Sequence, residues 1–290
     1  MTVVVVQRPT VRRRVLGANL RRLRTERGLH LEHAAEALSC DPSKISRIEK
    51  AESGIRQVDL KLLLDLYGIK DSAEREGWLV LARESRKRRW WRDLEDRLPN
   101  DFLDQVGLEE DVSYVHGFEP GVIHGLLQTQ PYAEAVICGG EPGPLSDERQ
   151  ARVQVRMERQ KAITRSANPL AAWMILGEAA LRQEYGGPEV LREQLRHLME
   201  VTELPNVTLQ VLPFSAGAYL GGPYPFMIYR FPEPSEMEVV VLENHTAQSY
   251  LETPRDTGYY GDIFNHLRAA ALDPIESQSL IRDIAAQLRR

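Results

Sequence analysis

The sequence predicts two domains of different fold class: an N-terminal all-α domain of five helices and a C-terminal α+β domain with a small sheet. Residues 11–83 repeat apolar side chains at helical spacing. Residues 99–290 alternate helical segments with short β-branched or aromatic runs bounded by Pro and Gly. A chain of 290 residues is long enough for two cores. We expect residues 1–10 to be a flexible tail and residues 84–98 a linker.

The first two predicted helices form one side of the N-terminal domain. In Val11–Arg27 the leucines at 16, 20 and 23 share an inner side, and most arginines lie elsewhere. A second helix begins near Leu31 and places Ala34 and Ala35 on one side, where small side chains allow close approach of a neighbouring helix. Ser39 and Cys40 then form a tight turn.

The third predicted helix has a well-marked start and two distinct faces. Asp41 supplies an N-cap oxygen, and Pro42 stands where a first-turn proline is tolerated. Ile45 and Ile48 lie three residues apart and must face inward. The polar side chains point the other way or lie at the flank: Ser43, Lys44, Ser46 and Arg47. Such a face can bind base edges and phosphates in a DNA major groove, although an ordinary helical hairpin with a solvated face has the same pattern.

Two further helices complete the domain. Residues 52–54 form a turn, and Val58–Tyr67 is a leucine-rich helix that Gly68 ends. Ser72–Arg83 follows, with Trp78, Leu79 and Ala82 inward. Five short helices in about eighty residues make a compact bundle.

Charge divides the chain in the same place. Residues 1–89 hold 20 Lys+Arg and 12 Asp+Glu, a net charge of +8, whereas the remainder holds 17 and 30, a net charge of −13. A basic N-terminal part attracts phosphates. It therefore favours DNA binding by the helix pair over an ordinary helical hairpin with a solvated face. An acidic remainder repels DNA, which indicates that it binds something else.

Residues 12–70 resemble the helix-turn-helix domain of the XRE class, relatives of the phage lambda and 434 repressors. The matching residues are Gly28-Leu29, Ala34-Ala35, Leu38 and Ile45-Ser46-Arg47-Ile48-Glu49. The resemblance implies that the base-reading positions are Pro42, Ser43, Lys44, Ser46 and Arg47. It also implies a buried ion pair between Arg24 and Glu49. One position departs from the family, because Leu31 stands where a phosphate-contacting Gln is usual.

The C-terminal region is expected to contain helices and four strands. The expected helices are 100–111, 128–138, 146–165, 178–185, 188–202, 257–272 and 274–288. The expected strands are 171–176, 207–212, 226–231 and 238–242, while Tyr114–Pro120 is treated only as a segment between helices. The strand order cannot be read from one sequence.

This region resembles the C-terminal domain of the actinobacterial WhiJ-like regulators, in which it follows an XRE-type domain. The matching residues include Trp90-Trp91, Phe118-Glu119-Pro120-Gly121, Gly125-Leu126-Leu127-Gln128-Thr129, Glu178-Ala179-Ala180-Leu181-Arg182, Pro205-Asn206-Val207-Thr208 and Gln210-Val211-Leu212-Pro213-Phe214. The resemblance implies a transcriptional regulator whose gene often neighbours that of a small partner protein. The group's C-terminal domain has no settled activity.

The sequence gives little indication of a catalytic, metal or cofactor site. No apolar run reaches the length of a membrane span, and no metal-ligand or phosphate-binding motif occurs, so we assign no cofactor, metal ligand or catalytic residue. Glu178 and Glu243 could face Arg152 or Arg156 in a polar cavity and act as acid and base, but surface ion pairs are favoured. The loop Gly217–Pro225 could cover a pocket, with a structural turn favoured.

The two cysteines, the basic run Arg86–Arg89 and the pair Trp90-Trp91 give further indications of structure or function. Cys40 and Cys138 lie in different domains, which favours a cytoplasmic protein without disulfides. Cys40 could be a redox sensor, but a small apolar turn residue is favoured. The run Arg86–Arg89 could touch DNA or form a solvated face. Trp90-Trp91 is expected to pack the linker onto the second domain.

These observations predict a sequence-specific DNA-binding regulator acting as a homodimer on a near-palindromic operator. Arg47 and Ser43 would read bases, and Arg13, Arg21 and Arg56 would hold phosphates. Two hypotheses remain for the acidic domain. It is either a platform for dimerisation and a small partner protein, which the sequence favours, or a small-molecule-sensing, even enzymatic, domain with a pocket beneath the 217–225 loop.

Overall fold

The chain forms two compact units in a computed structural model, and each is described separately. The structure describes residues 11–84, 98, 100–139, 146–232, 237–243 and 248–288. The expectations for the 1–10 tail, the basic run Arg86–Arg89, the Trp90-Trp91 pair and most of the linker therefore lie outside the described residues.

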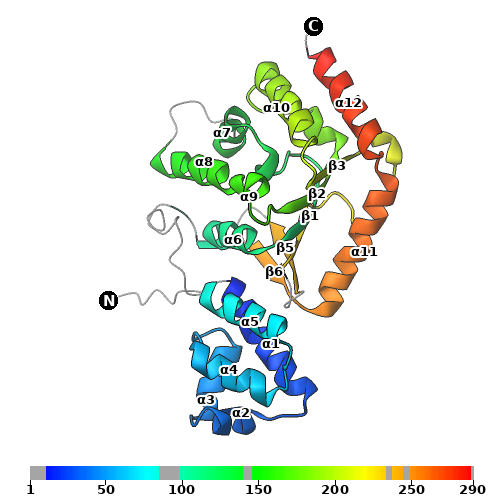
Figure 1. The fold of residues 1–290 in the computed structure, drawn as a ribbon. Coiled ribbons are helices and arrows are strands. Elements are labelled where there is room, and N and C mark those ends of the chain that lie inside the picture. Colours follow the sequence, from blue (N-terminus) through cyan, green and yellow to red (C-terminus); the bar gives the residue numbers. More distant parts are fainter. Residues whose placement is uncertain are drawn as a thin grey trace. The chain divides into compact units, whose positions relative to one another are not determined.

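The first unit is the five-helix domain that the sequence predicts (Figure 1). Its helices are α1 Val11–Glu26, α2 Leu31–Ala37, α3 Pro42–Glu49, α4 Gln57–Leu66 and α5 Ser72–Glu84. Three leucines of α1, two alanines of α2, two isoleucines of α3 and three leucines of α4 are buried in one core: Leu16, Leu20, Leu23, Ala34, Ala35, Ile45, Ile48, Leu60, Leu63 and Leu64. Trp78 of α5 is only 1% exposed and completes this core, so the predicted inner faces are confirmed.

Backbone features allow the helices to pack closely. Gly28 and Gly68 follow α1 and α4 with φ of +66° and +70°, a region that glycine adopts without strain. Ser39 takes φ +49° in the turn between α2 and α3. Gly17 has an ordinary φ, but a Cβ there would lie 2.6 Å from the carbonyl oxygen of Glu49. The missing side chain therefore lets α1 approach the end of α3.

The second unit holds a mixed sheet and its covering helices. Its strands are β1 Tyr114–Glu119, β2 Ala171–Gly177, β3 Val207–Leu212, β4 Phe226–Arg230, β5 Glu238–Glu243 and β6 Gln248–Leu251. Its α-helices are α6 Asn100–Asp111, α7 Gln130–Cys138, α8 Asp147–Arg159, α9 Lys161–Thr164, α10 Pro188–Val201, α11 Pro254–Ala270 and α12 Pro274–Gln287. Short 3-10 turns are η2 Gly125–Leu127, η3 Glu178–Leu181 and η4 Phe214–Ala216.

The strand order is β3-β2-β1-β4-β5-β6. Strands β1, β2 and β3 are parallel, while β4, β5 and β6 each run antiparallel to the preceding neighbour. Because β5 runs antiparallel to β4, it runs in the same direction as β1. The carboxyl ends of β1 and β5 therefore meet the same edge of the sheet.

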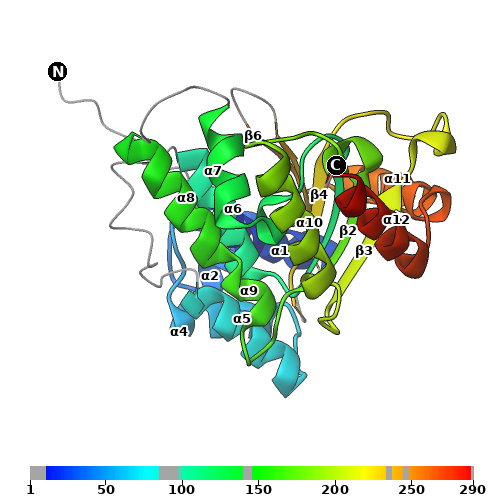
Figure 2. The ribbon, with the colours of Figure 1, turned by 90° about the horizontal axis from the view of Figure 1, so that it is seen from above.

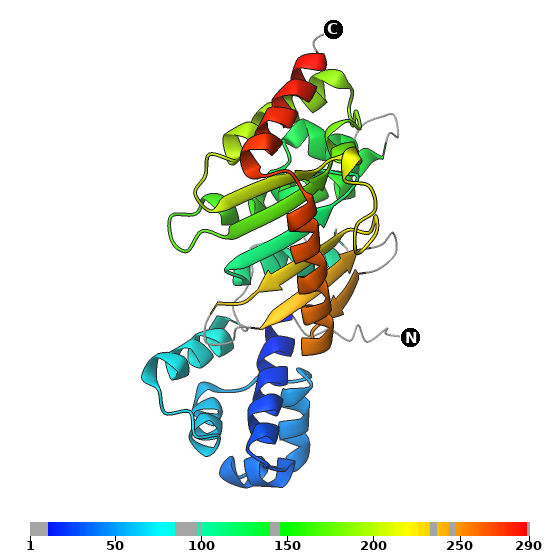
Figure 3. The same ribbon diagram turned by 90° about the vertical axis from the view of Figure 1, so that its right-hand side faces the viewer.

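Helices cover both faces of the sheet. Helix α11 crosses one face, where its Phe264 stacks on His116 of β1 and packs in a core with Phe118 (Figure 3). On the other face lie α6 and α8 (Figure 2). Tyr229 of β4 points to that side, because its hydroxyl bonds Glu109 of α6. Val115 of β1, which is paired with Tyr229, faces the same side, so alternate residues of β1 belong to different layers.

Several details of the second unit correct the sequence prediction. The segment Tyr114–Glu119, expected only as a connection, is the central strand β1, and β6 was not expected at all. The long helix predicted over 146–165 is two helices, α8 and the short α9. The helix predicted over 178–185 is only the 3-10 turn η3, since Gly186 and Gly187 follow in left-handed backbone conformations.

Candidate functional site

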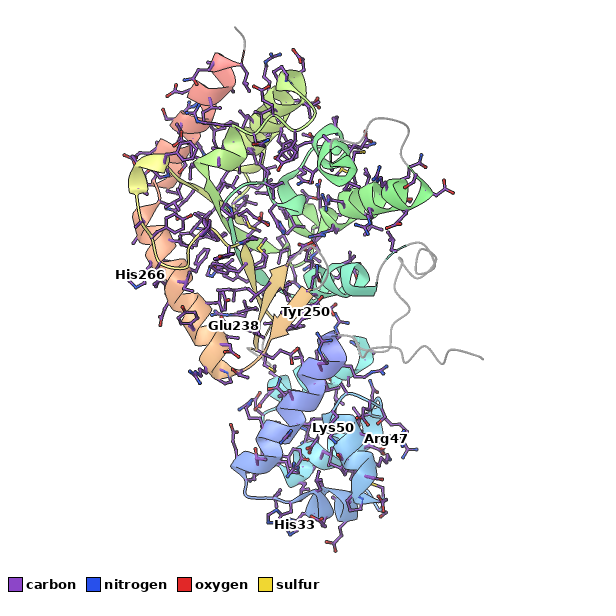
Figure 4. The ribbon with its side chains drawn as sticks, turned by 180° about the vertical axis from the view of Figure 1, so that it is seen from behind. His33, Arg47, Lys50, Glu238, Tyr250 and His266 are labelled. Atoms are coloured by element: carbon purple, nitrogen blue, oxygen red, sulfur yellow. The ribbon has the colours of Figure 1, made fainter. Side chains whose placement is uncertain are left out.

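The outer face of α3 is presented as the sequence predicts. The amide of Ser43 donates to Asp41 Oδ1 over 2.8 Å, which caps the helix, and Pro42 occupies its first turn. Ile45 and Ile48 are buried, whereas Ser43 and Arg47 are exposed. Pro42, Lys44 and Ser46 are partly exposed. Figure 4 shows Arg47 toward the edge of the helical unit.

Leu31, which stands where the XRE class usually has Gln, begins helix α2. Leu31 is partly buried and packs against the core of the helical unit, so it helps to hold α2 in place. His33 Nδ1 accepts a hydrogen bond from the His30 amide over 3.0 Å, and this bond satisfies a free donor at the helix start. His30 and His33 therefore have a structural role at the start of α2.

Helix α3 is anchored at both ends. At its C-terminal end Glu49 accepts two bonds from Arg24 of α1, which confirms the expected buried ion pair. Near its N-terminal end Lys44 Nζ donates to Asp59 Oδ2 of α4 over 2.9 Å. The outer face of α3 thus lies between two charged contacts to neighbouring helices.

Asp59 also binds Arg56. Arg56 Nε lies 3.2 Å from Asp59 Oδ2 and Arg56 Nη2 lies 2.9 Å from Oδ1. The side chain of Asp59 is 6% exposed, against 39% for Lys44 and 75% for Arg56. Sequence reasoning predicted both cations as DNA contacts but missed the carboxylate that holds them, because Asp59 reads as an ordinary first-turn acid of α4.

The remaining predicted phosphate contacts lie on α1. Arg21 is exposed and Arg13 is partly buried. Together with Arg47 of α3 and Arg56 before α4, they distribute positive charge over three parts of the helical unit.

In the second unit, a buried charged network joins α6, α8 and β4. Arg159 Nε donates to Glu109 Oε2 over 2.6 Å, and the side chains of the two residues are 3% and 1% exposed. The Tyr229 hydroxyl donates to Glu109 Oε1 over 3.0 Å. These partners lie 50 and 120 residues apart in sequence, so no local pattern could have indicated them. Full pairing of the buried charges indicates a structural role.

A second polar cluster, formed by Glu119, Arg156 and Glu243, has less internal pairing. Glu119 and Glu243 end β1 and β5 and, by the strand register, lie on the same face and edge, separated by β4. Arg156 Nη1 donates to Gln128 Oε1 over 3.1 Å, while its buried Nε has no hydrogen-bond partner. Burial, and then the charge of Glu243, raise the pKa of Glu119 to about 8. Burial lowers the pKa of Arg156 to about 10.

The less favoured possibility, that Glu178 faces Arg152 or Arg156, is wrong. Glu178 Oε1 instead accepts a bond from Arg182 over 2.8 Å, and its Oε2 accepts from the Phe214 amide over 2.9 Å. Arg152 pairs with Glu148 on its own helix. These contacts match the favoured interpretation of ion pairs near the surface.

The loop Gly217–Pro225 packs on α11. The Tyr219 ring lies 5.8 Å from that of Phe118, and Gly221, with φ +94°, leaves room for Ile263. A groove of about 610 Å³ lies elsewhere, between α10 and α12. Its charged lining residues are Glu189, Arg192, Glu193, Arg196 and Arg282.

Within the described parts of the chain, no three His, Cys, Asp or Glu residues are placed to hold a metal ion. The described helices also include none that is long and apolar enough to cross a membrane. Cys40 and Cys138 are free thiols, each partly buried.

The five-helix fold and the exposed α3 define a helix-turn-helix protein, and residues 15–78 match the family described as "Helix-turn-helix domain". This match indicates a DNA-binding regulator. Residues 102–283, more than half of the chain, match the family described as "Domain of unknown function (DUF5753)". The chain belongs to that family. No curated protein and no solved structure matches the chain.

Proposed function

We propose that this protein is a sequence-specific transcriptional regulator that inserts α3 into the DNA major groove. The observation that carries the proposal is the rigid mounting of α3 with Ser43 and Arg47 exposed on its outer face. Arg47 makes a bidentate contact with guanine, and Ser43 binds a neighbouring base edge. Pro42, Lys44 and Ser46 complete the contact surface.

Phosphate contacts come from Arg13, Arg21 and Arg56. These positions lie in the part of the chain with a net charge of +8, which supplies attraction to the DNA backbone independent of sequence. The acidic remainder, at −13, does not compete for DNA and is free for other partners.

The second unit serves dimerisation and the response to a small protein encoded by a neighbouring gene. A homodimer places two α3 helices about one DNA turn apart on a near-palindromic operator. Support comes from the acidic charge of this unit and from the resemblance to the WhiJ-like regulators. The groove between α10 and α12, with charges of both signs, is suited to a polar protein segment.

The test is selection of DNA from a random-sequence duplex library with the full chain, followed by light scattering of the complex. A recovered motif with two related half-sites, bound by two copies of the chain, supports the proposal. Enrichment of no sequence, with binding that depends on salt alone, contradicts sequence-specific recognition. A motif without symmetry, bound by a single copy, contradicts the homodimer.

The second candidate function is small-molecule sensing by the second unit. It is favoured by the cluster of Glu119, Arg156 and Glu243, where ionisable groups from three elements converge without ion pairs among them. Convergent polar groups with shifted pKa values are typical of ligand sites.

A metabolite thermal-shift screen, run beside a pull-down with the neighbouring gene product, separates the two. Glu119→Gln should abolish a metabolite shift that arises at the cluster, and Glu203→Gln, at an exposed position after α10, is its control. If metabolites shift melting and the neighbouring protein does not bind, the partner-protein proposal fails.

A further inference from the structure

The side chain of Asp59 is a buried carboxylate between two cations that belong to different elements. Lys44 is on α3 and Arg56 precedes α4, yet both donate to the same carboxylate over 2.9 to 3.2 Å. Asp59 is 4% exposed and lies in the first turn of α4. There the helix dipole favours a negative charge.

The carboxylate is ionised. Burial would raise the pKa of Asp59, but the hydrogen bonds from Arg56 and Lys44 outweigh burial and lower that pKa. Charge-assisted bonds of this kind fix the geometry of both partners. The long side chains of Lys44 and Arg56, which would otherwise sample many rotamers, are therefore restrained beside the start of α3.

The restraint changes what the two cations can do near DNA. Unrestrained lysine and arginine side chains can bind the phosphates of any DNA sequence, which raises affinity for DNA without discrimination between sequences. Cations held at fixed positions meet phosphates or base edges only in one register, and such contacts orient a protein on its site. Asp59 also reduces the charge of the trio from +2 to +1, which weakens attraction to arbitrary DNA.

We propose that Asp59 is a positioning residue for DNA recognition: by holding Lys44 and Arg56 beside the start of α3, it increases discrimination between the operator and other sequences. This inference rests on the proposed DNA-binding function. It assigns to a buried acid, which itself touches no DNA, a role in specificity.

The test compares the wild-type chain with Asp59→Asn on two duplexes, the sequence recovered by selection and a random-sequence duplex of equal length. We expect Asp59→Asn to bind random DNA more tightly, with a steeper salt dependence, because both cations are released. We expect the ratio of the two affinities to fall at least about fivefold, the lower end of the effect of one base contact.

Asp65→Asn is the matched control. Asp65 is on the same helix and pairs with Arg75 over 2.7 Å, but its side chain is 63% exposed and it contacts neither predicted DNA-binding cation. This variant should keep the wild-type affinity ratio. A second control compares the double variant Lys44→Ala/Arg56→Ala with the triple variant that also carries Asp59→Asn. These two variants should have the same ratio of operator affinity to random-sequence affinity.

The outcomes separate the two proposals. If the wild-type chain shows no preference for any sequence, the proposed function fails. If the wild type discriminates and Asp59→Asn, folded as judged by circular dichroism, weakens both duplexes equally or changes neither, the positioning role is overturned. Should Asp59→Asn not fold, Asp59→Glu keeps the charge but displaces the carboxylate by one methylene group. A reduced ratio for Asp59→Glu supports the inference, and an unchanged ratio overturns it.

Discussion

Arg24 of α1 and Glu49 at the end of α3 form a two-point ion pair inside the helical unit. Arg24 Nε lies 2.7 Å from Glu49 Oε1 and Nη2 lies 2.9 Å from Oε2, with side chains only 9% and 5% exposed. Arg24 Nη1 also donates to the carbonyl oxygen of Leu29 over 2.7 Å. One guanidinium thus joins α1, the loop before α2 and α3, and hydrogen bonding to Glu49 raises its pKa.

Removing the charge of Glu49 should destabilise the helical unit strongly. Glu49→Gln leaves the Arg24 guanidinium buried without its counterion, and we expect a loss of about 3–5 kcal/mol in the free energy of unfolding. Urea denaturation of the full chain measures this loss, with hydrogen exchange assigning the transition to α1–α5. Glu26→Gln is the control, since its pair with Arg22 is about half exposed and contributes about 0.5 kcal/mol or less. Equal losses for the two variants would contradict the buried-pair argument.

Arg47 and Arg21 should affect DNA binding in different ways. Arg47→Ala removes the proposed base contact, so we expect operator affinity to fall by about 1–3 kcal/mol while random-sequence affinity changes less. Arg21→Ala removes a proposed phosphate contact, which should weaken all sequences alike and reduce the salt slope by about 1. Fluorescence anisotropy at several salt concentrations measures both quantities. If Arg47→Ala binds the selected operator as the wild type does, the placement of α3 in the major groove is wrong.

Gly17 should not tolerate a side chain. Its Cβ position lies 2.6 Å from the Glu49 carbonyl oxygen and 2.7 Å from that of Ile48, and backbone atoms at this distance must move. We expect Gly17→Ala to destabilise the unit by about 1–3 kcal/mol, even though alanine has the higher helix propensity. Thermal melting measures the change, and Gly54→Ala, where no atom lies within 4 Å, is the control. A stabilised Gly17→Ala variant would show that α1 can move away from α3 without cost.

The helical unit could be predicted because its information is local. Periodic leucines, the Asp41-Pro42 start and the Gly68 end of α4 each depend on near neighbours in sequence, and the structure confirms them. The Arg24–Glu49 pair came from family resemblance. What was missed is the carboxylate of Asp59, because its partner Lys44 lies 15 residues away and meets it only after α3 and α4 have packed.

The sheet was harder to predict because its strands do not share one pattern. Strand β1 interrupts its apolar residues with His116 and Gly117. Gly117 fits beneath the sulfur atoms of Met174 and Met227, contacts that exist only once the sheet has formed. Strand β6 is four residues long and lies at the sheet edge, where partial exposure removes the apolar signal. Strand order likewise depends on contacts between distant segments.

Glu119 gives the second unit a pH dependence whose sign follows from its pKa. In the unfolded chain this carboxyl titrates near 4.5, whereas in the folded protein burial and the charge of Glu243 raise its pKa to about 8. Between these values the folded state holds a proton that the unfolded state has lost. The contribution of Glu119 to the free energy of unfolding therefore decreases as pH rises from about 4.5 to about 8, and it is constant above that range.

Glu119→Gln should remove this dependence, because the amide resembles the protonated acid and cannot ionise. We expect the variant to melt at a higher temperature than the wild type at pH 8, with the difference narrowing as pH falls toward 5. Differential scanning calorimetry at several pH values measures the difference, and Glu203→Gln should stay near the wild-type melting temperature throughout. A difference that stays constant between pH 5 and pH 8 would contradict a raised pKa of Glu119 in the fold. If the variant also melts below the wild type throughout that range, Glu119 is ionised in the fold, with Arg156 outweighing both burial and Glu243.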